Sequence, residues 1–448
     1  MITTPAFAGK RFAVLGLARS GMAAVESLLA GGAEVTAWDS REEPRRALEG
    51  RVELADPLTI DLAGYAGIVV SPGVPLNTHP IATHAASCGV PVIGDIELFA
   101  LARPHLPAHR VVGITGTNGK STTTALVHHV LQSAALPTRM GGNIGLPVLG
   151  QAPLPPGGVY VLELSSYQID LTHSLACDVA ALLNITPDHL DRYAGFEAYA
   201  ASKARLFEMQ HADQAAVFGV GDPETAAVAA RELARHQPGK VRSVDGSDLL
   251  QLQPGWPTLQ GPHNLQNAAI AVAIAEALGL TPAQWGPALA SFRGLPHRME
   301  RVAEAGGVLF VNDSKATNPA STAPALAAFP PNPNKRIHWI VGGLPKGDDL
   351  DDCAPHFGNI AAAYTIGEAG PLFAELLAPH MPVVRSEMMC DAIQQAMAAA
   401  RPGDVILLSP ACASFDQFRD YEARGDSFRQ IVQALIADQD PAAAEGTH

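Results

Sequence analysis

Short apolar runs alternate with alanine-rich amphipathic stretches along most of the chain, a pattern typical of parallel sheets covered by helices. Near the amino terminus, the pattern predicts a buried strand at residues 11–15, a helix at residues 21–30 and a strand at residues 34–38. Further strands are expected at residues 67–70, 110–114, 159–164, 308–311, 337–341 and 405–408. The chain is therefore expected to have an α/β fold with mostly parallel sheets.

The turn after the first predicted strand, residues 16–21, keeps the outer glycines of the dinucleotide-binding fingerprint but has Ala18 in the middle position. A Cβ at that position hinders the close approach of a pyrophosphate. Asp39 stands where NAD-binding folds place an acidic residue. Three interpretations stay open here: an NAD site, a site for another nucleotide or phosphate, and a structural turn. A second turn, residues 71–75, follows the strand at residues 67–70 and lies at the sheet edge where ligands bind.

Composition narrows the class of protein. The chain has 448 residues, enough for about three domains. Hydrophobic residues make up 47% and charged residues 17%, which is typical of a folded globular protein. The 30 Lys and Arg against 44 Asp and Glu give a net charge of −14, which would repel nucleic acid and anionic membranes. We therefore expect neither as a partner.

Cysteine usage and hydropathy indicate a reducing compartment. The five cysteines lie far apart without a Cys-x-x-Cys motif, so neither a zinc site nor a disulfide framework is indicated. The sequence contains no recognisable signal peptide and no uncharged stretch of about 18 apolar residues. We expect a cytoplasmic protein without membrane insertion.

Loop composition suggests where domains end. Residues 103–107, which include two prolines, separate a helical stretch at residues 98–102 from the strand at residues 110–114. Another region begins close to the strand at residues 308–311. We predict domains at residues 1–98, 99–299 and 300–448.

The strongest local signal is a glycine-rich loop between a strand and a helix. The sequence Gly-Thr-Asn-Gly-Lys-Ser-Thr at residues 116–122 follows an apolar strand and leads into a helix that begins near Ser121. In such loops backbone N–H groups face a polyphosphate, Lys120 adds positive charge, and the hydroxyl of Ser121 or Thr122 can bind Mg²⁺. Ile114 replaces the first glycine of the general P-loop pattern, so the match is to the shorter G-x-x-G-K-S form. The sequence predicts a nucleotide-binding P-loop.

Acidic and imidazole groups follow two other predicted strands. Glu163 lies at the end of the strand at residues 159–164, and the sequence Asp-His-Leu-Asp at residues 188–191 follows a second strand. Mg²⁺ prefers oxygen ligands together with substrate phosphate, and carboxylates at strand ends beside a P-loop can supply them. We therefore favour a metal-binding role for Glu163, whereas His189 by itself is more typical of a structural histidine.

Other polar residues have ordinary structural explanations. Lys203 lies on a predicted helix and, by pattern alone, is typical of a solvated charge. Asn264 and Asn267 could cap the long alanine-rich helix that follows, or their amides could bind a purine. Polar side chains of the kinds that bind ligands are also dense in three predicted loops, which favours binding sites there: residues 295–300, 312–319 and 409–418.

Together these motifs resemble the Mur ligase family. The matching motifs occur in family order and span most of the chain: residues 116–122, 163–166, 188–192, 263–267, 294–298, 312–318 and 409–414. The sequences at residues 313–318 and 409–414 favour the branch of the family that adds D-glutamate.

The resemblance implies a fold and a reaction. The fold is a Rossmann-like amino-terminal domain, a central P-loop ATPase domain with a mostly parallel sheet, and a Rossmann-like carboxyl-terminal domain. ATP phosphorylates the carboxylate of UDP-N-acetylmuramoyl-L-alanine, and the amine of D-glutamate displaces phosphate from the acyl phosphate, a step of peptidoglycan precursor synthesis. Transfer of a phosphoryl group between two anions requires cations, which Lys120 and a pair of Mg²⁺ ions would supply. We expect a monomer.

The resemblance also implies residue roles. Catalytic positions match Lys120, Glu163, His189 and Lys203, and metal positions match Ser121, Glu163, His189 and Lys203. Lys203 matches a carbamylated lysine, which would replace the interpretation as a solvated charge. ATP positions match Gly116, Thr117, Asn118, Gly119, Lys120, Ser121, Thr122, Asn143, Asn264, Asn267, His297, Arg298 and Asp313. Substrate positions match Arg19, Ser20, Ser40, Arg41, Ser71, Gly73, Asn143, Ser165, Gln168, Lys315, Thr317, Lys346, Ser414 and Tyr421.

Competing functions remain. A sibling Mur ligase that adds another amino acid, or a ligase like folylpolyglutamate synthetase, would share the central chemistry. The branch that adds a diamino acid carries an Asp-Asn-Pro-Arg motif. Here Asn318-Pro319 is followed by Ala320 and not by arginine, so the motif is absent at this place. A nicotinamide-dependent oxidoreductase built on residues 11–39 would leave Lys120 and Glu163 without a role. A nucleotide-binding regulator without catalysis is disfavoured by the complete set of catalytic matches.

Overall fold

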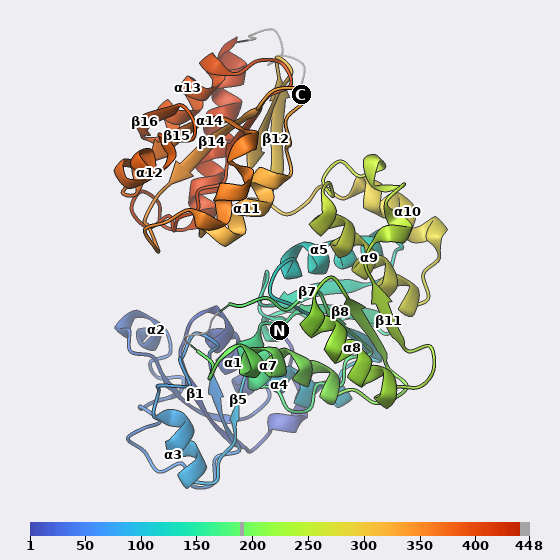
Figure 1. The fold of residues 1–448 in the computed structure, drawn as a ribbon. Coiled ribbons are helices and arrows are strands. Elements are labelled where there is room, and N and C mark those ends of the chain that lie inside the picture. Colours follow the sequence, from blue (N-terminus) through green and yellow to red (C-terminus); the bar gives the residue numbers. More distant parts are fainter. Residues whose placement is uncertain (189–191, 440–448) are drawn as a thin grey trace. The chain divides into compact units, whose positions relative to one another are not determined.

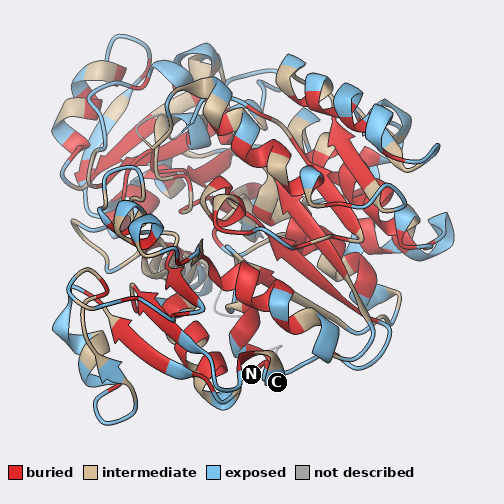
Figure 2. Cartoon of the chain, turned by 90° about the horizontal axis from the view of Figure 1, so that it is seen from below, coloured by how far each residue is buried: buried red, intermediate tan, exposed pale blue. Residues whose placement is uncertain are grey.

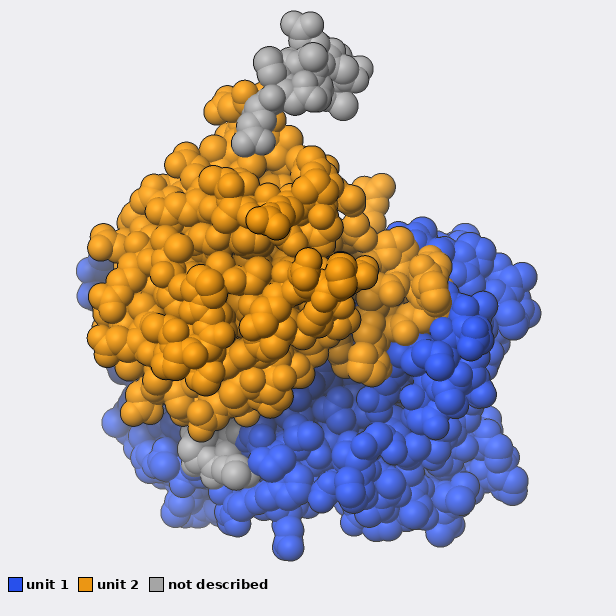
Figure 3. All heavy atoms as spheres, turned by 45° about the horizontal axis from the view of Figure 1, so that its top comes forward, with its two compact units in different colours: residues 1–252, 264–291 blue, residues 253–263, 292–448 orange. Residues whose placement is uncertain are grey.

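The computed structural model describes residues 1–188 and 192–439, and the chain divides into two compact units (Figure 3). Unit 1 comprises residues 1–252 and 264–291, and unit 2 comprises residues 253–263 and 292–448. Mostly parallel sheets flanked by helices build both units (Figure 1). This confirms the predicted α/β class.

The amino-terminal sheet of unit 1 has the strand order β3-β2-β1-β4-β5, and its strands run parallel. Its elements are β1 (Arg11–Leu15), α1 (Arg19–Ala30), β2 (Glu34–Trp38), α2 (Glu42–Arg46), β3 (Glu53–Leu54), β4 (Gly67–Val70), α3 (Ile81–Ser87), β5 (Val92–Ile93) and α4 (Asp95–Ala102). Side chains of β1 alternate between two cores: Phe12 and Val14 pack on the side of α1, and Ala13 and Leu15 on the side of α3. Burial on both faces explains the continuous apolar run of this strand.

The central sheet of unit 1 has the order β11-β10-β9-β6-β8-β7, again parallel. Its strands are β6 (His109–Thr115), β7 (Thr138–Gly142), β8 (Gly158–Glu163), β9 (Val179–Leu182), β10 (Ala215–Gly219) and β11 (Val241–Val244). The helices are α5 (Lys120–Ser133), α6 (Ser166–Asp170), α7 (Phe196–Glu208), α8 (Pro223–Arg235), α9 (Pro262–Ala277) and α10 (Pro282–Ser291). Because β6 lies between β8 and β9, the loops after these three strands meet at one sheet edge.

The sheet of unit 2 has the order β12-β13-β17-β14-β15-β16, in which only the pairing of β12 with β13 is antiparallel among the described residues. Its strands are β12 (Glu300–Ala305), β13 (Val308–Asn312), β14 (Ile337–Gly342), β15 (Ile360–Ile366), β16 (Val383–Glu387) and β17 (Val405–Leu408). The helices are α11 (Pro319–Ala327), α12 (Gly370–Leu377), α13 (Met389–Ala399) and α14 (Tyr421–Gln439). Trp339 packs in the core that contains residues of α11 and α12, and Ile340 in the core with residues of α13 and α14.

Burial follows this layered arrangement. The strands are largely buried, whereas many helices expose one side (Figure 2). In the described part of the chain, no helix combines the length and apolar character needed to cross a membrane.

Candidate active site

The P-loop lies between β6 and α5, as the sequence predicts. Gly119 precedes α5 in the left-handed conformation (φ 83°), and a Cβ there would collide with the side chain of Asn267. Both constraints require glycine. The N–H of Asn118 donates to Oδ1 of Asn184 (2.8 Å), which fixes the loop from the strand end of β9. The amino terminus of α5 thereby presents backbone N–H groups and a positive dipole, which favour an anion.

Two lysines converge on one carbonyl of this loop. Lys120 Nζ donates to the carbonyl oxygens of Gly116 (2.9 Å) and Thr117 (2.8 Å), and Lys203 Nζ also donates to Gly116 O (2.8 Å). Lys203 is only 2% exposed and lies over the ring of Tyr199 at 4.6 Å. Burial, reinforced by the charge of Lys120, lowers the pKa of Lys203 well below its ordinary value. The interpretation of Lys203 as a solvated charge is wrong, because α7 turns this residue toward the P-loop.

A buried carboxylate lies at the end of β8. Glu163 Oε1 accepts from Asn143 Nδ2 (2.9 Å), so these two predicted residues are brought together. Its Oε2 is buried and has no hydrogen-bond partner in residues 1–188 and 192–439. Ser121, in the first turn of α5, is also buried. An unsatisfied carboxylate oxygen and a hydroxyl beside a P-loop suit a hard cation such as Mg²⁺.

His189 lies outside the described residues, so its predicted metal role stays a prediction. Within the described ranges, no group of three or more His, Cys, Asp and Glu side chains gathers as a metal site.

The segment after Glu163 is fixed by a helix cap. Ser165 Oγ accepts from the N–H of Gln168 (3.3 Å), and Gln168 Oε1 accepts from the N–H of Ser165 (3.2 Å), a capping box at the start of α6. The carboxylate of Asp95 is fully buried close to Gln168, and burial raises its pKa to about 6. Two residues predicted to bind substrate therefore fix the segment that follows Glu163.

Asn264 and Asn267 do not cap their helix. Because α9 begins at Pro262, a favoured first residue of helices, both amides lie inside the helix. Asn267 Nδ2 donates to Asn264 Oδ1 (3.2 Å), and Asn267 lies against Gly119 of the P-loop. The capping interpretation is wrong, and the amides lie next to the predicted phosphate site.

The predicted uridine-side residues lie at the carboxyl ends of β1, β2 and β4: Arg19, Ser20, Ser40, Arg41, Ser71 and Gly73. Ser71 Oγ donates to Gly16 O (2.7 Å), which connects the turn after β1 to the turn after β4. Asp39 accepts from the N–H groups of Leu17 (2.7 Å) and Arg41 (2.9 Å). Asp39 thus organises this edge through the backbone, a role that the prediction of substrate residues missed.

In unit 2 the predicted residues gather at the carboxyl ends of β13, β14 and β17: His297, Arg298, Asp313, Lys315, Thr317, Lys346, Ser414 and Tyr421. Lys315 Nζ lies 4.0 Å from the ring centroid of Tyr421, and Lys346 Nζ donates to Thr317 Oγ1 (3.2 Å). Asp313 accepts from Ser409 Oγ (2.8 Å), and burial raises its pKa to about 7.

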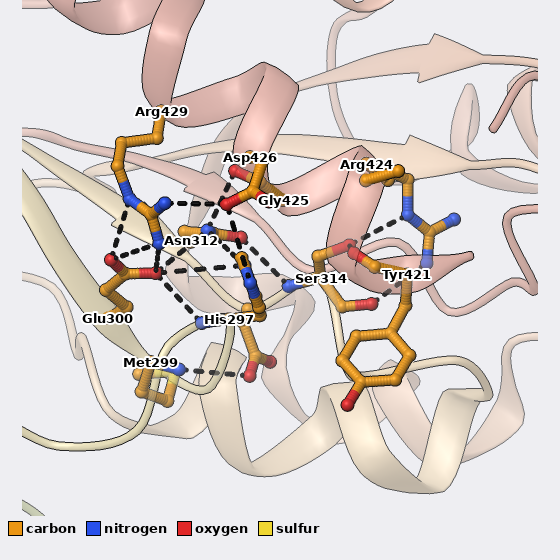
Figure 4. Close-up of polar contacts among 12 residues, drawn as sticks. His297, Met299, Glu300, Asn312, Ser314, Tyr421, Arg424, Gly425, Asp426 and Arg429 are labelled. Atoms are coloured by element: carbon orange, nitrogen blue, oxygen red, sulfur yellow. Dashed lines mark hydrogen bonds and ion pairs between the residues drawn. The ribbon is translucent and has the colours of Figure 1, made fainter. Parts of the chain in front are cut away.

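Arg424 connects the loops at this sheet edge, a role that the sequence analysis missed. Its guanidinium, 1% exposed, donates to the carbonyls of Ser314 (2.9 Å), Ala413 (3.0 Å) and Cys412 (3.0 Å) and to Ser314 Oγ (3.0 Å). It thereby joins the loop after β13 to the loop after β17, and Ser314 Oγ donates to Tyr421 O (2.9 Å) (Figure 4). An arginine on a helix gives no sequence signal for such a role.

Comparison with known proteins agrees with this arrangement. Family models match three segments: the Mur ligase MurD-like N-terminal domain at residues 10–94, the Mur ligase middle domain at residues 114–249, and the Mur ligase glutamate ligase domain at residues 297–412. Among solved structures, UDP-N-acetylmuramate-alanine ligase from Thermotoga maritima has a TM-score of 0.57 at 16% identity, covering 95% of this chain and 99% of its own. At that identity the likeness supports the fold alone.

Sequence relatives are much closer. A protein of Novosphingobium aromaticivorans is 72% identical and covers 100% of both chains, and one of Sphingopyxis alaskensis is 60% identical over 98% of this chain and 100% of its own. Both are named UDP-N-acetylmuramoylalanine–D-glutamate ligase. The chain belongs to the Mur ligase family.

Proposed function

We propose that this protein is an ATP-dependent ligase that joins D-glutamate to UDP-N-acetylmuramoyl-L-alanine, a cytoplasmic step of peptidoglycan precursor synthesis. The observation that carries the proposal is the convergence of Lys120 and Lys203 on Gly116 O beside the buried carboxylate of Glu163. Cations and a metal-type carboxylate at a helix amino terminus are what phosphoryl transfer between two anions requires. The names of the 72% and 60% identical relatives supply the substrates.

In unit 1, the P-loop residues 116–122 bind the ATP phosphates, and Lys120 exchanges its carbonyl partners for phosphate oxygens. Asn143, Asn264 and Asn267 complete the nucleotide contacts. Ser121, Glu163 and His189 would hold Mg²⁺, which would supply positive charge to the phosphates, and a pair of ions is proposed.

Lys203 is proposed to carry a carbamate. Because burial lowers the pKa of its ammonium, the neutral amine is easier to form, and its nitrogen lone pair can add to CO₂ with loss of a proton. The product is a carboxylate-like group that would serve as a metal ligand in place of an ammonium.

The remaining residues position the two acceptor substrates. Arg19, Ser20, Ser40, Arg41, Ser71 and Gly73 bind the uridine diphosphate part, with Ser165 and Gln168 toward the reacting end. His297, Arg298 and Asp313 are proposed to contact ATP, while Lys315, Thr317, Lys346, Ser414 and Tyr421 bind D-glutamate and the transferred phosphate. We further propose a monomer with domains at residues 1–98, 99–299 and 300–448.

The reaction begins when the L-alanyl carboxylate attacks the γ-phosphorus of ATP and ADP leaves. The amine of D-glutamate then attacks the acyl phosphate, the carbon–oxygen bond to phosphate breaks, and the amine loses a proton as the amide forms. Lys120 stabilises the charge that develops on the transferred phosphoryl group. No nucleophilic side chain is needed.

The test is phosphate release from ATP and Mg²⁺ with UDP-N-acetylmuramoyl-L-alanine, offered D-glutamate, L-glutamate, a diamino acid or no amino acid. We expect turnover with D-glutamate alone. Turnover with a diamino acid instead would assign the chain to a sibling branch, and absence of turnover with all of them would contradict a ligase function.

A further inference from the structure

The turn that carries His297 and Arg298 has a strained backbone. His297 (φ 62°) and Met299 (φ 47°) both lie in the left-handed region, which side chains with a Cβ rarely adopt. Such a conformation persists only where surrounding groups hold it. Glu300, Asn312 and Arg429 surround the turn and contact it or each other (Figure 4).

Glu300, the first residue of β12, is the centre of these contacts. Its Oε2 accepts from the N–H of His297 (2.8 Å) and from Asn312 Nδ2 (3.0 Å). Arg429 of α14 binds both carboxylate oxygens, with Nη2 at 2.8 Å from Oε1 and 3.1 Å from Oε2 and Nε at 3.0 Å from Oε1. This forked ion pair couples the turn to α14.

Asn312, fully buried at the end of β13, orients the His297 ring. Its Oδ1 accepts from the N–H of Ser314 (3.2 Å), so its Nδ2 is the group that faces His297 Nδ1 at 3.1 Å. Nδ2 also faces Glu300 Oε2 (3.0 Å) and Gly425 O (3.1 Å), so its two hydrogens are shared among three acceptors. A proton on Nδ1 would place two donors 3.1 Å apart, so an unprotonated Nδ1 fits this position, which leaves the proton of a neutral ring on Nε2. That nitrogen lies 3.7 Å from Asp426 Oδ1, and Asp426 is itself bound by Arg429 Nη1 (2.6 Å).

The ring has little room to turn. A Cβ at Gly425 of α14 would collide with His297 Nδ1, so the helix backbone lies directly against the imidazole. The turn is also bound to the loop after β13, because the N–H of Met299 donates to Asp313 Oδ1 (3.1 Å) and the N–H of Lys315 to His297 O (3.0 Å).

We propose that Glu300, Asn312 and Arg429 are positioning residues for nucleotide binding: they hold the His297–Arg298 turn in its left-handed form and keep His297 in the Nε2-protonated tautomer. Glu300 and Asn312 lie in predicted loops where the sequence favours binding sites, but the resemblance gives none of these three residues an individual role. The inference rests on the proposed function, in which His297 and Arg298 contact ATP. The inference predicts that the two ligands respond differently. Loss of the hydrogen bonds of Glu300, Asn312 or Arg429 weakens nucleotide binding and leaves D-glutamate binding intact.

The test compares Glu300→Gln with Glu304→Gln in the full chain. Glu304 is a matched control because it lies on the same strand and pairs with Arg301 (3.1 Å) at an exposed site. We expect Glu300→Gln to weaken Mg·ADP binding, measured by calorimetry, by on the order of tenfold, which corresponds to loss of one charge-assisted contact. The KM for ATP rises in parallel, the KM for D-glutamate stays within about twofold, and Glu304→Gln changes neither.

Arg429→Met is the second variant, because it removes the fork and retains the carboxylate. Suppose that the wild-type chain binds Mg·ADP and that both Glu300→Gln and Arg429→Met bind it equally well. That result would overturn this inference and leave the proposed function standing. Failure of the wild-type chain to bind ADP would overturn the proposed function and this inference with it.

A spectroscopic readout tests the tautomer without turnover. In protein labelled with ¹⁵N-histidine, the ring signals of His297 are identified by their loss in His297→Gln. We expect the pattern of a ring protonated at Nε2 in the wild-type chain and a mixture of tautomers in Asn312→Ala. A wild-type ring protonated at Nδ1 would overturn the proposal, even where Asn312→Ala does not fold.

Discussion

The P-loop region of unit 1 and the loop cluster of unit 2 use charge in opposite ways. In the P-loop region, Lys120 and Lys203 donate to the same backbone carbonyl, and Glu163 Oε2 has no hydrogen-bond partner among the described residues. In unit 2, Glu300 is bound by a forked arginine, and Arg424 donates to four oxygens of the surrounding loops. In the proposed function the first region uses its charge to bind phosphate and metal, whereas the second uses charge to fix the backbone.

The largest effect is expected where charge acts on ligand directly. Lys120→Met should lower the rate of phosphate release by about 10³-fold, because the developing phosphoryl charge loses its cation. The measurement is steady-state phosphate release at saturating substrates, together with the melting temperature. Lys10→Met, at an exposed position, is the matched control and should be indistinguishable from wild type. Activity of Lys120→Met within tenfold of wild type would contradict a role in phosphoryl transfer.

The same contrast explains how much the sequence could predict. The P-loop is determined locally: a strand, glycines with special backbone angles and a helix start follow one another within residues 109–123, and the structure agrees with the expected strand to within one residue at each end. The parallel α/β fold could also be predicted, since apolar runs buried on two faces differ plainly from amphipathic helices.

Groups that act through distant partners could not be predicted from local sequence. The burial of Lys203 depends on the packing of α7 against a loop that precedes it by about 85 residues. Arg424 contacts Ser314, in the loop after β13, and Arg429 contacts Glu300, the first residue of β12. Both partners lie more than 100 positions earlier in the chain. On a helix, such arginines have the same pattern as solvated ones. The capping prediction for Asn264 and Asn267 was wrong because Pro262 starts the helix earlier.

The next prediction tests the role of charge in unit 2. Arg424→Met should raise the KM for D-glutamate by on the order of 100-fold, because the carbonyls of Ser314, Cys412 and Ala413 lose their donor and the two loops separate. Burial already lowers the pKa of Arg424 to about 10, so the methionine also removes a costly buried charge. Steady-state kinetics and thermal melting measure the two effects.

Arg424→Lys separates charge from geometry at this position. A lysine retains the charge but cannot reach all four oxygens, so it should restore only part of the affinity for D-glutamate. Full restoration by lysine would show that charge alone matters and would remove the contrast between the two regions.

A smaller effect is expected from Asp95 in unit 1, whose raised pKa of about 6 lies above the unfolded value of 3.8. The folded chain binds the extra proton between these two values, so the residue destabilises the fold increasingly as pH rises toward 6. Asp95→Asn should therefore raise stability at pH 7.5 by about 1 to 2 kcal/mol, below the limit of about 3 kcal/mol set by the pKa shift, because the amide also needs partners.

Urea unfolding midpoints at pH 5.0 and pH 7.5 measure this effect of Asp95→Asn. The gain over wild type should be clearly larger at pH 7.5. Asp61→Asn, at an exposed site of the same sheet region, is the control and should show no such pH dependence. An equal gain at both pH values would mean that burial does not raise the pKa of the Asp95 carboxyl.

The smallest effect is expected at the exposed edge of the unit 2 cluster, where Lys346 donates to Thr317 Oγ1 at 3.2 Å. Thr317→Val keeps the shape of the side chain and removes this contact and the hydroxyl. Because exposed contacts to lysine contribute about 0.2 to 1 kcal/mol, the KM for D-glutamate should rise about two- to fivefold and the melting temperature should not change. Thr59→Val, exposed in unit 1, is the control and should match wild type in both measurements.

Thr317→Val could instead raise the KM for D-glutamate as much as Arg424→Met does. The Thr317 hydroxyl would then bind substrate directly, with a strength that the exposed contact does not suggest. The cluster would then resemble the P-loop region, with its key polar groups reserved for ligand instead of the backbone.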